Sequence, residues 1–171
     1  MSFSLLPSFM TDSLTDLTPS FLSEHGVQLL MMDFDNTIVP YVTDVPTRKV
    51  EQWIRTMQES KITLCVVSNS HKDRVKIFCK KYGIDCITHA KKPFSKGIRE
   101  CLQKYQIQAE KCALVGDQIY TDTIGANCAG VQSILVKAIN NHNFWLKARH
   151  VLEIPFILMA HNRKINRDNA D

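Results

Sequence analysis

The sequence predicts an α/β protein, a three-layer sandwich in which helices cover both faces of a mainly parallel five-stranded sheet. Short apolar runs alternate with stretches whose apolar residues recur at helical spacing, and this alternation is typical of strand–helix–strand units with right-handed crossovers. Several of the apolar runs are followed at once by polar or charged residues, as expected where parallel strands end at a ligand-binding edge.

The first half of this pattern begins with a lead-in that holds short helical pieces around 18–25, because Pro7 and Pro19 limit their length. A mostly apolar run over 27–32 then predicts a strand over about 27–34 that is buried on both faces, although so short a run alone also fits a helix segment. A loop leads to a helix from about residue 47, followed by a strand over 62–67.

The second half repeats the alternation. A helix over 72–82 ends at Gly83, and a short strand over 85–88 follows. Ser95 is placed to cap the next helix, which leads to a strand over 112–115. A helix of small residues through Gly130 precedes the last strand, over 132–136.

With 171 residues the chain is long enough for one well-buried core, so we expect one domain over 1–171. Its core spans about 26–137, between a lead-in over 1–25 and a C-terminal extension over 138–171. The six cysteines contain no Cys-x-x-Cys, which argues against zinc and for reduced thiols in the cytoplasm. No apolar run approaches the ~20 residues needed to cross a bilayer.

Charge is distributed unevenly along the chain. The first lysine or arginine is Arg48, whereas six acidic residues precede it, so the remainder is strongly basic. This asymmetry favours an anionic partner, whether a phosphate, a nucleic acid or an anionic membrane, although a solvated surface of mixed charge explains it equally well.

The most informative stretch follows the first buried strand. Asp33 and Asp35 point to the same side of an extended chain, and two ionised carboxylates there favour a divalent cation. An EF-hand loop is excluded, because Ile38 and Asp44 occupy the positions that need Gly and Glu. A simple polar turn remains the alternative from this stretch alone.

Other strand ends add the groups that phosphoryl transfer needs. Ser68 and Lys92 can hold phosphate oxygens, and Asp117 and Asp122 can hold Mg²⁺. An aspartate can attack phosphorus while a second carboxylate exchanges protons with the leaving oxygen and with water.

The order and spacing of these residues over about 27–136 resemble the haloacid-dehalogenase (HAD) superfamily of phosphatases. The resemblance implies a HAD-like Rossmannoid fold, a Mg²⁺ cofactor and an aspartyl-phosphate intermediate. It implies that Asp33 is the nucleophile and Asp35 the general acid and base. It also implies a metal site formed by Asp33, Asp117 and the backbone carbonyl of Asp35, in which Asp122 either binds the metal or steadies the site. Phosphate ligands would be Ser68, Asn69 and Lys92, supported by Thr37 and Gly116.

The stretches DLTP, DFDNTIVP, VVSNS, KKP and GDQIYTD, between Asp16 and Asp122, resemble HAD subfamily IIIA and its phosphatidylglycerophosphate phosphatases. The gaps between motifs leave no room for a cap domain, so the site should be open and suit a phosphate on a large molecule: a lipid at a membrane, a nucleic-acid end or a phosphoprotein. We therefore expect a lipid phosphate as substrate, no nucleic-acid partner, and contact with the inner face of a membrane. That contact could be supplied by Phe3, Leu6, Phe9 and an aromatic, basic stretch over 144–164. Packing of the same apolar side chains onto the sheet is the alternative.

Three other functions fit parts of the pattern. A HAD phosphatase of a soluble nucleotide, sugar or protein phosphate would share every catalytic motif. A receiver domain would place its lysine last, whereas Lys92 precedes Asp117 here. A non-catalytic phosphate-binding scaffold would not need the complete set of reactive groups that this sequence retains.

Overall fold

A computed structural model of the protein describes residues 4–71 and 73–139. The predicted C-terminal extension, from residue 140 onward, and Phe3 lie outside the described residues. The sheet has six parallel strands in the order β1-β6-β5-β2-β3-β4. These strands are β1 (Phe9–Thr11), β2 (Leu29–Met32), β3 (Thr63–Val67), β4 (Asp85–Ile87), β5 (Cys112–Gly116) and β6 (Gln132–Val136).

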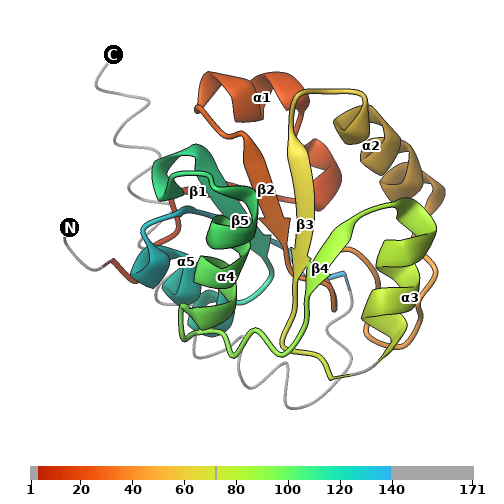
Figure 1. Cartoon of the computed structure of the whole chain (residues 1–171). Coiled ribbons are helices and arrows are strands. Elements are labelled where there is room, and N and C mark those ends of the chain that lie inside the picture. Colours follow the sequence, from red (N-terminus) through yellow and green to blue (C-terminus); the bar gives the residue numbers. More distant parts are fainter. Residues whose placement is uncertain (1–3, 72, 140–171) are drawn as a thin grey trace.

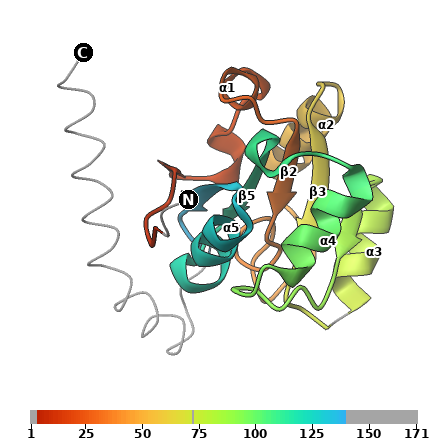
Figure 2. The ribbon, with the colours of Figure 1, turned by 60° about the vertical axis from the view of Figure 1, so that its left-hand side comes forward.

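Helices cover both faces of the sheet, which gives the three layers expected from the sequence (Figures 1 and 2). The α-helices are α1 (Pro19–Glu24), α2 (Arg48–Gln58), α3 (Asp73–Tyr82), α4 (Lys96–Tyr105) and α5 (Ile124–Ala129). Buried apolar side chains of α1, α2 and α3 form a core on one face of the sheet, and those of α4 and α5 form a core on the other. Short 3₁₀ turns occur at Leu14–Asp16 and Ala109–Lys111, and a π-helical turn, η3, occupies Ile119–Thr123.

The central strand β2 shows why its sequence is apolar without interruption. Leu30 and Met32 belong to the core on one face of the sheet, and Leu29 and Met31 belong to the core on the other. All four side chains are fully buried, as a parallel strand covered on both faces requires.

Helix α2 is tied to the chain ahead of β2. Thr47 caps the helix by accepting a hydrogen bond from Val50 N, and Trp53 Nε1 donates a buried hydrogen bond of 2.7 Å to Leu17 O. The side chains of Val50, Trp53, Ile54 and Met57 are buried along one face. The DLTP segment is therefore part of the packed fold.

The expected number of strands is wrong by one, because the lead-in also contributes a strand. β1 adds to the sheet edge beside β6, with Phe9 opposite Ile134. The Phe9 ring contacts the rings of Phe21 and His25 at centroid distances of 5.4 and 4.5 Å. Phe9, which we expected among the side chains available to a membrane, thus packs against the core.

A second expectation also fails. Ser95 precedes α4, but its side chain makes no capping hydrogen bond. The chain enters this helix through a cis Lys92–Pro93 peptide bond, and the first turn is held by Ala90 O, which accepts from Gly97 N. A backbone hydrogen bond, and not a hydroxyl cap, is therefore present at the first turn of α4.

All strands are parallel, so their carboxyl ends lie along one edge of the sheet, at the lower side of Figure 1. In the described part of the chain, the segment between β2 and β3 contains one helix, and so does the segment between β3 and β4. These segments hold no inserted cap domain. Within 4–71 and 73–139, no helix combines the length and apolar character needed to cross a membrane.

Candidate active site

The predicted site residues come from four neighbouring strands. Asp33 follows β2, Ser68 follows β3, Lys92 lies beyond β4, and Asp117 follows β5. Because β5, β2, β3 and β4 are consecutive in the sheet, their ends deliver these side chains to one region. Only Asp122 comes from a helical turn, η3, which begins directly beyond β5.

Three buried carboxylates form the centre of this region. Asp33, Asp117 and Asp122 each offer an oxygen within 4.8 Å of the others. The Lys92 ammonium lies between two of them, and its Nζ donates to Asp33 Oδ1 and to Asp122 Oδ1 at 2.6 Å each. The Lys92 side chain is only 1% exposed, so these ion pairs are shielded from water.

Burial dominates the electrostatics of the carboxylates. Desolvation raises the pKa of Asp33 to about 6, although the nearby Lys92 ammonium opposes the shift. Desolvation, together with the negative charges of Asp33 and Asp122, raises the pKa of Asp117 to about 8. Burial alone would lower the pKa of Lys92, but attraction by Asp122 and Asp33 raises it above its usual value. Burial and the mutual repulsion of the carboxylates therefore disfavour the ionised forms of Asp33 and Asp117, and the Lys92 ammonium offsets this only in part.

Two predicted supporting residues have clear structural positions. Thr37 Oγ1 donates to Asp117 Oδ1 at 3.4 Å, which links the turn after β2 to the carboxylate after β5. Gly116 lies against Asp122, and a Cβ at position 116 would come within 2.6 Å of Asp122 Cβ. Asp122 Oδ2 also accepts from Gln118 N at 3.1 Å. Glycine at 116 thus leaves room for the Asp122 carboxylate.

The predicted phosphate ligands lie beside the cluster. Ser68 is buried, and its Oγ accepts from Ser70 N at 3.1 Å. The side-chain amide of Asn69 is engaged with the backbone of Lys92: Nδ2 donates to Lys92 O at 2.8 Å, and Oδ1 accepts from Lys92 N at 2.7 Å. The Asn69 side chain therefore joins the loop after β3 to the loop that carries Lys92.

The structure does not bring the Asp35 carboxylate into the three-acid cluster of the described residues. Asp35 Oδ1 instead lies 3.3 Å from Nη1 of Arg74, a residue of α3. Sequence reasoning did not select Arg74. The available signal was its position in the first turn of the helix after Ser68, four residues before the inward-facing Phe78.

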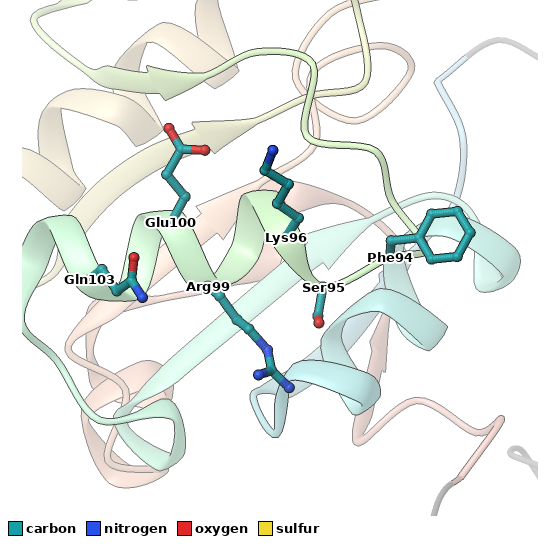
Figure 3. A pocket seen from close by; sticks show the side chains of 6 residues that line it. All are labelled: Phe94, Ser95, Lys96, Arg99, Glu100 and Gln103. Atoms are coloured by element: carbon teal, nitrogen blue, oxygen red, sulfur yellow. The ribbon is translucent and has the colours of Figure 1, made fainter.

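A separate hollow lies along α4 (Figure 3). Its lining side chains point in different directions instead of converging on one point, unlike the polar groups of a typical small-molecule site. None of them is a predicted site residue; they are Phe94, Ser95, Lys96, Arg99, Glu100 and Gln103.

The three-acid cluster fits a divalent cation. Hard divalent ions prefer carboxylate oxygens, and the cluster offers three of them in a buried space. An added positive charge would also favour the ionised forms of Asp33 and Asp117, whose pKa values are raised. Asp33, Asp117 and Asp122 are thus the residues that would hold such an ion.

Comparison with known proteins identifies the family. Residues 42–136, more than half of the chain, match the haloacid dehalogenase-like hydrolases. The "Probable phosphatase YqeG" of Bacillus subtilis strain 168 is 34% identical over 131 residues, which is 77% of this chain and 76% of that protein. The chain belongs to the haloacid dehalogenase-like hydrolases.

Solved structures share the fold. The cobalt-bound deoxy-D-mannose-octulosonate 8-phosphate phosphatase of Haemophilus influenzae superposes with a TM-score of 0.53 at 12% identity, over 75% of this chain and 89% of that one. The 3-deoxy-D-manno-octulosonate 8-phosphate phosphatase of Yersinia pestis superposes with a TM-score of 0.52 at 18% identity, over 74% of this chain and 71% of that one. At such low identity, these similarities concern the fold alone.

Proposed function

We propose that the protein is a Mg²⁺-dependent phosphomonoester hydrolase that acts through a phosphoryl group carried by Asp33. The protein is a phosphatase of the HAD type, as the family match and the similarity to a probable phosphatase indicate. The observation that supports the mechanism best is the cluster in which Asp33 adjoins Asp117, Asp122 and the buried Lys92 ammonium.

In the proposed reaction, a carboxylate oxygen of Asp33 attacks the substrate phosphorus. The bond from phosphorus to the leaving oxygen breaks, and Asp35 donates a proton to that oxygen. Asp35 then takes a proton from the water that attacks the phosphoryl group on Asp33. The bond between Asp33 and phosphorus breaks, which releases inorganic phosphate and restores the free carboxylate.

The remaining residues orient the phosphate and balance its charge. Lys92, already held by Asp33 and Asp122, places a cation beside the attacking oxygen. Ser68 and Asn69 would bind the phosphate oxygens; the hydrogen bond from Asn69 Nδ2 to Lys92 O, which joins the two loops, supports this role. Asp33, Asp117 and Asp122 would hold Mg²⁺, which would supply charge neutralisation for the phosphoryl oxygens.

For the substrate, we propose a glycerophospholipid carrying a terminal phosphate, such as phosphatidylglycerophosphate, met at a membrane surface. The subfamily IIIA motifs and the absence of a cap among the described residues support this proposal. Large apolar side chains are also exposed on the loops beyond β2 and Lys92: Val42 is 84% exposed, Val45 69% and Phe94 75%. Such side chains suit contact with the apolar part of a lipid.

The test is a phosphatase assay across two groups of substrates, with Mg²⁺ and with EDTA. We expect Mg²⁺-dependent phosphate release, fastest from phosphatidylglycerophosphate in mixed micelles. Faster hydrolysis of nucleotide, sugar or protein phosphates would reject a lipid as the substrate but would leave the assignment as a phosphatase intact. Activity that is unchanged by EDTA would reject the proposed metal.

A further inference from the structure

We infer that Arg74 is a positioning residue that fixes Asp35 and the loop over 40–44 relative to the catalytic cluster. This inference rests on the proposed function, because it assigns Asp35 the proton transfers described above. Arg74 lies in α3, which follows β3 in the sequence, yet its side chain contacts the loop that begins at Asp33 and Asp35.

The guanidinium of Arg74 donates hydrogen bonds to three backbone carbonyl groups of this loop. Nη1 donates to Tyr41 O at 2.7 Å, and Nη2 donates to Thr43 O at 2.7 Å and to Pro40 O at 3.4 Å. Three carbonyl groups of one short loop thus meet one side chain. A planar group with five N–H donors can make such contacts together, whereas a lysine ammonium cannot reproduce their geometry.

The same guanidinium also lies between two carboxylates. Nη1 is 3.3 Å from Asp35 Oδ1, and Nε is 2.6 Å from Asp44 Oδ1. The carbon at the centre of the group stands 5.1 Å from the centroid of the Phe34 ring, the residue between the two catalytic aspartates. The side chains of Arg74 and Asp35 are 11% and 22% exposed, whereas that of Asp44 is 57% exposed. The contact with Asp35 is therefore better shielded from water and salt than the contact with Asp44.

The loop has its own internal constraints at the catalytic end. Asn36 adopts a left-handed backbone with φ of 61°, and its side-chain oxygen accepts from Tyr41 N at 3.1 Å. Asn36 N donates to Val39 O at 2.7 Å, which closes the turn directly after Asp35. Arg74 fixes the other end of the loop. A shift of the loop would therefore carry the Asp35 carboxylate away from the leaving oxygen.

Kinetics of Arg74→Met test the inference, with Arg55→Met as the matched control, since Arg55 is an exposed arginine on α2. Misplacing a catalytic group by about 1 Å can cost ~10²-fold in rate. We expect kcat of Arg74→Met to fall by up to about that factor with a much smaller change in KM. Equal kcat values for the Arg74→Met and Arg55→Met variants would overturn the inference.

A double-mutant cycle separates positioning from a general structural effect. If Arg74 acts through Asp35, adding Arg74→Met to Asp35→Asn should cost far less than it costs the wild type. Losses that multiply in the double variant would mean that Arg74 acts independently of Asp35, and the inference would fail.

Hydrogen exchange supplies a readout that does not require activity. The amides of Tyr41 and Thr43 are hydrogen-bonded within the loop, and they should exchange faster in Arg74→Met than in Arg55→Met. Unchanged protection would remove the basis of the inference even if wild-type activity were absent. An inactive wild type with faster loop exchange in Arg74→Met would reject the proposed function alone.

Discussion

Lys92 is the residue on which the charge balance of the site depends. It is the cation placed between Asp33 and Asp122, and its side chain is almost inaccessible to water. Removing one partner of a buried ion pair leaves uncompensated charge, which costs far more free energy than losing an exposed pair.

We therefore expect Lys92→Met to lower the free energy of unfolding of the metal-free protein by about 3–5 kcal/mol at pH 8. Mg²⁺ should recover part of the loss, because it can balance the same carboxylates. Lys104→Met is the control, since Lys104 pairs with Asp85 at 2.7 Å on the surface, and its loss should cost no more than about 1 kcal/mol. Equal losses in urea titrations of the two variants would contradict this account of Lys92.

At the scale of elements, the sheet edge brings together residues that are far apart in the sequence. β5 delivers Asp117, and η3 turns back at once so that Asp122 returns to the same space. Gly116 permits this close return because it has no side chain facing Asp122.

Gly116→Ala should therefore displace the Asp122 carboxylate and weaken both Mg²⁺ binding and turnover. Gly125→Ala is the matched control in α5, where a Cβ would come no nearer than 3.3 Å to Ile98 Cδ1 and alanine favours the helix. Calorimetric titration with Mg²⁺ measures the difference. If Gly116→Ala binds Mg²⁺ as tightly as Gly125→Ala does, Asp122 is not held as described.

The sequence pattern predicted some of these elements correctly and missed others. The buried run before Asp33 and the helical spacing of Val50, Trp53 and Met57 gave the right element types, because burial imposes a strong period. The strand β1 was not predicted, since its three residues are too few to show a periodic pattern. The link between Asp35 and Arg74 could not be predicted either, because it depends on how α3 packs beside the loop after β2.

At the scale of the whole molecule, the buried carboxyl groups make the free energy of unfolding depend on pH and on bound metal. The pKa values of Asp33 and Asp117 are raised from 3.8 to about 6 and about 8, so the folded state binds more protons than the unfolded state between these values. The free energy of unfolding of the metal-free protein should therefore fall as pH rises from about 4 to about 8.

Mg²⁺ should oppose this fall, because it favours the ionised carboxylates, and the gain in Tm on adding Mg²⁺ should increase with pH across the same range. Thermal unfolding in EDTA and in Mg²⁺ measures both trends. Asp117→Asn should flatten the dependence most between about pH 6 and pH 8, the range between the raised pKa values of Asp33 and Asp117. A Tm gain that is the same at pH 5 and pH 8 would contradict the assignment of the metal to these carboxylates.

The central claim is that Asp33 carries the phosphoryl group during turnover. The direct measurement is rapid acid quenching of the protein with a radiolabelled phosphomonoester and Mg²⁺, followed by peptide mapping. The account predicts label on Asp33 in the wild type, and neither label nor turnover in an Asp33→Asn variant that remains folded by circular dichroism. Turnover at the wild-type rate by folded Asp33→Asn, or label on a different residue, would contradict it.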